Sequence, residues 1–378
     1  MFIDRITAPL LNRFLRAFPV IGITGPRQSG KTTLLKHALP NYNHITFDDD
    51  FNITAFEEDP KGFLKQHHDH VIFDEVQFVP KLFNQLKILV DNDRSNYGRF
   101  VITGSSQFSF LKNVSESLAG RIGLMTQLPL QFSETPKTEQ HNSIYCGGYP
   151  ELVLREYRDS DLWYASYLDT YLTKDVQALT QIGDRRDFRR LIQLLAANVS
   201  QILDMSHYAR EIGVSVPTIK RWISVLEASY IIFLLPPYHK NYGSRITKSP
   251  KIYFYDTGLI SYLTSIINFD LYDKGPLAGP LFENYIVSEV MKKTKHTGSS
   301  DELFYLRTQD KAEIDLIVDK KTRCDFIEIK KSNTYTPKMS ATLKHFSEKQ
   351  DRMIVLYNGE TMQHGDIRVL HYSDYLLG

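Results

Sequence analysis

Short apolar runs mark the first third of the chain, and between them apolar residues recur at helical spacing. The runs are predicted as buried strands, because they are short and are bounded by turn residues. The predicted strands lie at 20–24, 43–47, 71–73, 99–103 and 122–128, and the one at 43–47 is more polar than the others. Residues 8–18 and 33–39 are predicted as helices from the spacing of their apolar positions. Buried strands that alternate with helices predict an α/β fold with a parallel sheet.

The turn after the first predicted strand has the sequence Gly25-Pro26-Arg27-Gln28-Ser29-Gly30-Lys31-Thr32, which fits the pattern G-x-x-x-x-G-K-[ST] throughout. A strand, a glycine-rich turn and a helix N-terminus direct backbone N–H groups towards one point, so the expected ligand is a nucleotide. We expect Lys31 to reach the β- and γ-phosphates and Thr32 to bind Mg²⁺. The predicted ATP-binding segment runs from Gly25 to Thr33. A chance turn is the alternative, and the flanking strand and helix argue against it.

Polar side chains follow the later apolar runs. Asp74 and Glu75 come directly after the third run, and we expect Asp74 to hold Mg²⁺ and Glu75 to activate the attacking water. Thr103 and Ser105 end the next run; they either sense the γ-phosphate or form a polar turn. Arg121 precedes the last run, and it is either an ordinary salt-bridge partner or an arginine finger.

The composition narrows the class of protein but does not identify a ligand. The 378 residues are enough for two or three domains, and a net charge of +1 excludes neither acidic nor basic partners. Cys146 and Cys324 match neither a disulfide framework nor a zinc pattern. No apolar run approaches the roughly 18 residues of a membrane span, and the N-terminus lacks a secretion pattern. We therefore expect a cytoplasmic protein that does not enter the membrane.

The middle of the chain predicts a helix-turn-helix. Ser206 is expected to cap a helix at 207–212, and Ser215 to cap a second helix at 216–228. Residues 231–255 supply the strands of a wing. Together these elements predict a winged helix.

This middle segment is basic. Between Gly183 and Ile252 the chain has eleven Lys and Arg residues against five Asp and Glu residues. A basic segment in a nearly neutral protein suggests phosphate contacts, with Thr218, Lys220 and Arg221 as the candidate DNA contacts. The alternative is a winged helix that binds a protein or acts as a lid.

The last hundred residues place acidic residues and a lysine on neighbouring strands. The predicted strands are 302–307, 312–319 and 324–330. If Asp319 pairs with Cys324, antiparallel pairing puts Asp315 opposite Glu328, and Glu313 opposite Lys330, all on one face. Such a group predicts a Mg²⁺ site with a lysine that polarises a phosphate. A slip of one residue would separate the group, and surface salt bridges are the alternative interpretation.

In its motifs the chain resembles the AAA-type P-loop ATPases of bacteria and archaea that carry a C-terminal domain of unknown function related to PD-(D/E)xK nucleases. The resemblance rests on the phosphate loop and on FDEVQ (73–77), ITGSS (102–106), LAGR (118–121), GGYPE (147–151), PKIYFYDTGL (250–259) and FEN (282–284). It implies an ATPase core with a DNA-associated C-terminal half. Together with the helix-turn-helix predicted from the residues, the expected fold class is a P-loop NTPase core of the AAA/ASCE type, a winged-helix middle and an α/β restriction-endonuclease-like C-terminal domain. Asp315, Glu328 and Lys330 match the D…E-x-K signature, and Glu283 matches its helical acid.

We therefore expect a P-loop ATPase domain, a helical connector, a winged-helix domain and a nuclease-like domain, at 1–137, 138–182, 183–272 and 273–378. The expected function is a Mg²⁺-dependent ATPase that couples its nucleotide state to a DNA-associated C-terminal half. Two alternatives stay open: an ATP-regulated DNA endonuclease, and a non-catalytic ATP-gated switch. The nucleotide is the expected partner, with DNA, another protein or further copies of the chain as additional candidates.

Overall fold

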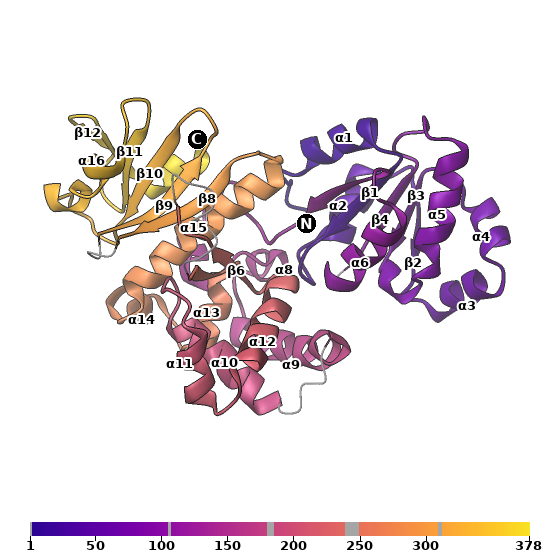
Figure 1. The fold of residues 1–378 in the computed structure, drawn as a ribbon, viewed down its shortest axis with the longest axis horizontal. Helices are drawn as coiled ribbons and strands as arrows, with labels where there is room; N and C mark the ends of the chain where they lie inside the picture. The colour runs from indigo at the N-terminus through magenta and orange to yellow at the C-terminus, as the bar shows by residue number, and fades with distance from the viewer. Residues whose placement is uncertain (1, 105–106, 180–184, 239–248, 309–311) are drawn as a thin grey trace. The chain divides into compact units, whose positions relative to one another are not determined.

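Figure 1 shows the computed structural model, which describes all residues except 1, 105–106, 180–184, 239–248 and 309–311. The chain divides into two units. Unit 1 contains Met1–Leu130, Ala228–Tyr230 and Lys295–Gly298. Unit 2 contains Gln131–Glu227, Ile231–Thr294 and Ser299–Gly378. The four expected domain ranges remain predictions.

Unit 1 is built on a parallel sheet, as the apolar runs predict. Its strands are β1 (Val20–Thr24), β2 (Asn43–Thr46), β3 (Val71–Asp74), β4 (Phe100–Thr103) and β5 (Ile122–Thr126), in the spatial order β2-β3-β4-β1-β5. Because all run in the same direction, the residues that follow each strand meet at one edge of the sheet. This carboxyl edge is where the ligands of open α/β sheets bind.

Helices cover both faces of this sheet. They are α1 (Ala8–Ala17), α2 (Lys31–Ala38), α3 (Asp50–Glu58), α4 (Pro60–Gln66), α5 (Lys81–Asn92) and α6 (Gln107–Ser117), with the short 3₁₀ helix η1 (Val76–Phe78). Neighbouring residues of a strand point to opposite faces. Ile72 packs in the core that contains Leu11 of α1, whereas Phe73 packs in the core that contains Phe83 of α5. β3 is therefore buried on both sides, which explains the unbroken apolar run before Asp74.

A short return of the chain completes unit 1. Lys295–Gly298 belongs to this unit although it lies far along the sequence. There the imidazole of His296 is fully buried, and its Nε2 accepts a hydrogen bond of 3.0 Å from the backbone N–H of Leu128. The contact fixes the chain just beyond β5.

The first part of unit 2 is mainly helical. Its elements are α7 (Ser143–Cys146), α8 (Pro150–Leu154), α9 (Ser160–Leu179), α10 (Arg185–Ala197), α11 (Met205–Ile212), α12 (Val216–Ala228), the antiparallel pair β6 (Ile232–Leu235) and β7 (Lys251–Phe254), α13 (Thr257–Leu263) and α14 (Phe269–Lys274).

The two predicted helices of the turn motif form, but one cap differs. Ser215 accepts a hydrogen bond from the N–H of Thr218 at 3.3 Å, so the predicted cap of α12 is confirmed. The predicted cap Ser206 is wrong, because α11 begins earlier and the carboxylate of Asp204 accepts from the N–H groups of Ser206 and His207. Asp204 has the extended backbone that a cap residue needs.

The rest of unit 2 contains a long helix and a mixed sheet. The elements are α15 (Ala278–Thr297), β8 (Glu302–Arg307), β9 (Glu313–Asp319), β10 (Cys324–Ile329), η3 (Pro337–Ser340), α16 (Leu343–Phe346), β11 (Arg352–Tyr357), β12 (Met362–His364), β13 (Ile367–His371) and α17 (Tyr372–Leu377). The order across the sheet is β12-β13-β11-β10-β9-β8. Cys324 pairs with Asp319, so the predicted register of the β9–β10 hairpin is confirmed.

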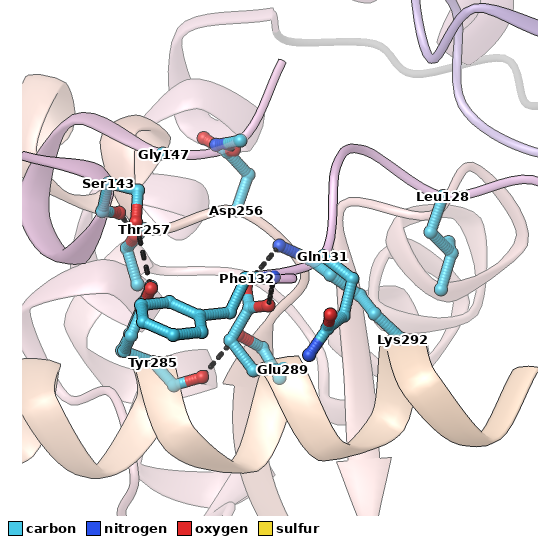
Figure 2. Close-up of polar contacts among 12 residues, drawn as sticks. Leu128, Gln131, Phe132, Ser143, Gly147, Asp256, Thr257, Tyr285, Glu289 and Lys292 are labelled. Carbon is cyan, nitrogen blue, oxygen red and sulfur yellow. Dashed lines mark hydrogen bonds and ion pairs between the residues drawn. The ribbon is translucent and has the colours of Figure 1, made fainter. Parts of the chain in front are cut away.

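Buried polar contacts hold the middle of α15 (Figure 2). Glu289 accepts from the backbone N–H of Phe132 at 2.5 Å and from the ammonium of Lys292 at 2.7 Å. One turn earlier, the hydroxyl groups of Tyr285 and Ser143 lie 2.8 Å apart. These bonds connect α15 to the segment before α8. In the described part of the chain, every helix is too short or too polar to span a bilayer.

Candidate functional site

Two glycines shape the loop between β1 and α2. Gly30 has a φ of 88°, and Gly25 has a φ of 145°. A Cβ atom at Gly25 would lie 2.0 Å from the carbonyl oxygen of Gln127, so only glycine fits between the loop and the end of β5. The loop ends as α2 begins at Lys31, which directs the helix N-terminus at the space over the loop.

Lys31 and Thr32 lie at this helix start. The Lys31 ammonium is buried and donates to the carbonyl oxygens of Gly25 at 3.1 Å and Pro26 at 2.9 Å. The Thr32 hydroxyl donates to Oδ2 of Asp74 at 2.6 Å. The structure thus brings together Thr32 and Asp74, which the sequence analysis assigned to one Mg²⁺ ion.

The loop also offers a polar atom without a protein partner. The Ser29 hydroxyl is 1% exposed and has no hydrogen-bond partner among the described residues. A buried, unpaired hydroxyl is costly unless a ligand completes it. The Ser29 hydroxyl can donate to a phosphate, and the oxygen atoms of Thr32 and Asp74 can bind Mg²⁺. The residues present therefore fit a Mg²⁺–nucleotide complex.

Thr103, Glu75 and Gln77 complete the polar group at the carboxyl edge. The Thr103 hydroxyl donates to Oδ1 of Asp74, so both oxygens of this carboxylate are held. Glu75 adopts a left-handed backbone with a φ of 57°, which is strained for a side-chain-bearing residue. The Gln77 amide donates to the Glu75 carboxylate. Ser105 lies outside the described residues.

One histidine at this edge was not predicted. His44 of β2 has its Nε2 atom 3.5 Å from Oδ2 of Asp74. Burial lowers the pKa of His44, against the opposite effect of the Asp74 charge. Only the pairing of β2 with β3 brings the two residues together, and nothing in the local sequence signals it.

The underside of the loop is fixed by residues far from it in sequence. The guanidinium of Arg5 is buried and donates to the carbonyl oxygens of Ser29 at 2.8 Å and Leu128 at 2.7 Å. At the end of β1, the hydroxyl of Thr24 lies 2.7 Å from that of Tyr230. Sequence reasoning missed both Arg5 and Tyr230, because neither belongs to a local motif.

Arg121 lies at the other edge of the sheet. β1 and β5 run parallel with Val20 opposite Ile122, so Arg121 flanks the amino ends of the strands and the phosphate loop follows their carboxyl ends. Its guanidinium makes two bonds to Asp91 of α5, of 2.7 and 2.9 Å. The hydrogen bond lowers the pKa of Asp91. Arg121 therefore does not reach the loop of its own unit.

A second polar group lies in unit 2, where Asp315, Glu328 and Lys330 come together as the register predicts. The Lys330 ammonium is 2.6 Å from Oε1 of Glu328 and 3.2 Å from Oδ2 of Asp315. The backbone N–H of Ile329 also donates to Oδ2 of Asp315 at 2.8 Å.

Glu283 joins this group together with a lysine that was not predicted to be there. Glu283 lies on α15, and its Oε1 accepts from the Lys251 ammonium at 2.9 Å and from the Tyr253 hydroxyl at 2.6 Å. Lys251 also lies 2.5 Å from Oε1 of Glu313. We call Glu283, Glu313, Asp315, Glu328, Lys251 and Lys330 the carboxylate cluster.

Glu283 and Glu328 hold their protons more tightly than an ordinary glutamate does. Burial and the charge of Asp315 raise the pKa of Glu283 to about 7 and that of Glu328 to about 8. The carboxylates raise the pKa of Lys251 although burial alone would lower it. Within the described ranges, no three His, Cys, Asp or Glu side chains have an arrangement that could hold a metal ion.

The DNA-contact candidates lie on α12. Lys220 and Arg221 are exposed, whereas Thr218 is half-buried and bonds to the cap hydroxyl of Ser215 at 2.9 Å. Of the other basic residues counted in this segment, Lys240, Arg245 and Lys248 lie outside the described residues. Lys251 is buried in the carboxylate cluster, so its charge is not on a surface.

Comparison with protein families divides the chain in three. The AAA domain family matches residues 17–135. Two families described as domains of unknown function, DUF8612 and DUF4143, match residues 137–270 and 278–375.

Some relatives match nearly the whole chain. The uncharacterized protein Rv2008c of Mycobacterium tuberculosis is 32% identical over 363 residues, which cover 94% of this chain and 80% of that protein. The uncharacterized protein Mb2031c of Mycobacterium bovis gives the same values. Among solved structures, the Walker-type ATPase of Pyrococcus abyssi has 14% identity and a TM-score of 0.47, over 70% of this chain and 96% of that one. The chain thus belongs to the family of Rv2008c, and its N-terminal part is an AAA-type ATPase domain.

Proposed function

We propose that the protein is a Mg²⁺-dependent ATPase whose nucleotide state controls its C-terminal half. The observation that carries the proposal is the 2.6 Å bond between Thr32 and Asp74 beside the phosphate loop. A hydroxyl at a helix start and a carboxylate at the end of a neighbouring strand are the pair with which P-loop enzymes hold Mg²⁺. Bound there, Mg²⁺ neutralises charge on the β- and γ-phosphates.

Other residues of the site would bind the phosphates and activate the attacking water. The loop N–H groups and Lys31 bind the phosphates, with the Lys31 ammonium turning from the carbonyl groups of Gly25 and Pro26. Glu75 takes the proton of the attacking water, and Gln77 holds its carboxylate in place. Thr103 links Glu75 and Asp74, because its oxygen accepts from the Glu75 N–H at 3.4 Å and donates to Asp74.

Two substitutions test these roles. Lys31→Ala is expected to abolish binding of a fluorescent ATP analogue, whereas Lys36→Ala, on the exposed side of the same helix, should leave binding unchanged. Glu75→Gln is expected to bind ATP normally and to lose turnover by a factor of 10² or more. Tight binding by Lys31→Ala would contradict the site, and full turnover by Glu75→Gln would show that another group is the base.

The second candidate function is an ATP-regulated DNA endonuclease. It is favoured by the convergence of Glu283, Asp315, Glu328 and Lys330, and by the exposed Lys220 and Arg221 of the proposed winged helix at 183–272. The proposed nuclease-like domain at 273–378 would then cut DNA with a divalent metal, and the helical connector at 138–182 would link it to the ATPase domain at 1–137.

One assay separates the candidates. ATP turnover is measured with and without duplex and single-stranded DNA, and the integrity of the DNA is followed in the same samples. DNA-stimulated turnover supports coupling to a DNA-binding half, and cleavage that disappears in Asp315→Ala supports the endonuclease. Negligible turnover under all conditions, with tight ATP binding, would favour a non-catalytic switch that binds a protein or DNA.

A further inference from the structure

Lys251 is a positively charged residue that is buried in unit 2. It is the first residue of β7 and is 1% exposed. Its ammonium lies 2.9 Å from Oε1 of Glu283 on α15 and 2.5 Å from Oε1 of Glu313 on β9. A charge this deeply buried is costly unless opposite charges contact it directly. Lys251 is therefore a bridging cation between two carboxylates of the cluster.

The position of Lys251 is fixed by contacts that later residues of β7 make with α15. The Tyr253 hydroxyl donates to the same oxygen of Glu283 at 2.6 Å. The next residue of α15, Asn284, accepts from the N–H of Phe254 at 2.8 Å and donates to the Phe254 carbonyl at 3.1 Å. β7 is thus bound to the start of α15 by side chains from both elements, which holds the ammonium at the carboxylates.

Basic side chains of the chain itself contact the carboxyl groups of the cluster. Lys330 lies between Asp315 and Glu328, and Arg307 lies 3.3 Å from the second oxygen of Glu313. Four carboxylates thus face three basic side chains. A Mg²⁺ ion needs oxygen ligands at about 2.0–2.1 Å, and at Oε1 of Glu283 it would meet the ammonium that is already bonded to that oxygen. Repulsion between the two cations opposes binding.

We propose that Lys251 is the built-in cation of the carboxylate cluster and excludes a divalent metal ion from Glu283. The inference concerns the same carboxylates as the endonuclease hypothesis, and it requires neither DNA cleavage nor ATP hydrolysis. If it holds, loss of the Lys251 ammonium opens the carboxylates of Glu283 and Glu313 to a divalent ion.

The test uses the full-length protein without nucleotide, with Mn²⁺ as the probe. Bound Mn²⁺ is measured from the loss of the free-ion signal in electron paramagnetic resonance, and thermal unfolding is recorded with and without Mn²⁺. In the wild type, Glu283→Gln should not change Mn²⁺ binding. Lys251→Met should gain one Mn²⁺ per chain, with an unfolding temperature that rises with Mn²⁺, and adding Glu283→Gln should remove both effects.

A matched lysine variant is the control. Lys320 lies 2.8 Å from the carboxylate of Asp325, whose side chain is 2% exposed, outside the cluster. Lys320→Met should gain no Mn²⁺, which separates a specific site from the general effect of uncovering a buried acid.

Two results would overturn the proposal: wild-type Mn²⁺ binding that is lost in Glu283→Gln, or a folded Lys251→Met variant that gains no Mn²⁺. A Lys251→Met variant that folds only with Mn²⁺ supports it. If that variant does not fold at all, the comparison of the wild type with Glu283→Gln still decides. Because neither cleavage nor turnover is the readout, failure here is distinct from failure of either proposed activity.

Discussion

The hydroxyl groups of Tyr230 and Thr24 lie 2.7 Å apart, although 206 residues separate them in sequence. Thr24 ends β1 directly before the phosphate loop, and Tyr230 lies between α12 and β6. The Tyr230 backbone is left-handed, with a φ of 59°, a conformation that costs about 1 kcal/mol or more outside glycine. The bond therefore joins Thr24, directly before the phosphate loop of the proposed ATP site, to Tyr230, just after the end of α12.

We predict that Tyr230→Phe weakens both the fold and the ATP site. The change removes the buried hydroxyl bond to Thr24, and one such bond is worth about 1 kcal/mol. The unfolding free energy should fall by that amount, and ATP affinity should fall up to about fivefold, measured by denaturant unfolding and by titration. Tyr157→Phe is the control, because it loses a 3.0 Å bond to the Gly147 carbonyl in unit 2. Equal losses of ATP affinity in both variants would refute a specific role for Tyr230.

The ion pair of Arg121 and Asp91 leads to a second prediction. Both residues lie at the amino edge of the sheet, so Arg121→Ala and Asp91→Ala should lower the melting temperature by similar small amounts. Neither should change ATP turnover in dilute protein. Turnover lost only in Arg121→Ala, and restored by mixing with Glu75→Gln chains, would instead show that Arg121 acts on the nucleotide of a neighbouring copy.

Protonation of Glu283 predicts a pH dependence of stability. Its pKa is raised from 4.5 to about 7 in the folded protein, so the folded state binds more protons than the unfolded state between these values. Stability from this group is greatest below about pH 4.5 and falls as pH rises towards 7. Unfolding measured at pH 5 and pH 8 should show a smaller decline for Glu283→Gln than for the wild type.

The control for this pH experiment is Glu302→Gln. Glu302 pairs with Lys321, and both side chains are 49% exposed. Its removal should leave the decline between pH 5 and pH 8 as it is in the wild type. A decline that is equally steep in the Glu283 variant would show that Glu283 is ionised in the folded protein at neutral pH.

The cap of α11 gives a fourth prediction. Asp204→Ala should lower the melting temperature, because the first N–H groups of the helix lose their acceptor. Ser206→Ala should have little effect, because the variant keeps the backbone N–H that donates a hydrogen bond to the Asp204 carboxylate. A larger effect for the serine variant would reverse the assignment of the cap.

The error at this cap shows what sequence patterns decide and what they leave open. Asp204 and Ser206 are both good cap residues, and only the extended backbone of Asp204 selects it. The loop at 25–32 was predictable because its ligands are contiguous in sequence. The contact of Asp315 and Glu328 with the same lysine, Lys330, was predictable because a short turn sets the register of the hairpin.

Contacts between distant segments were not predictable. Arg5 beneath Ser29, Tyr230 beside Thr24 and Lys251 beside Glu283 each depend on how separate elements pack. The sequence analysis assigned no role to Arg5, Tyr230 or Lys251, and a buried lysine looks the same in sequence as a surface one. The resemblance to a family placed Lys251 in a motif without assigning it a role.

The composition of unit 1 also constrains how the protein is made. Ribosomes add residues in order, yet this unit includes Lys295–Gly298, where His296 bonds to Leu128. After Leu130 emerges, the chain up to Lys295 takes roughly ten to thirty seconds to synthesise at about 5–20 residues per second. During that time unit 1 lacks Lys295–Gly298. The backbone N–H of Leu128 then has no His296 imidazole to which it can donate its hydrogen bond.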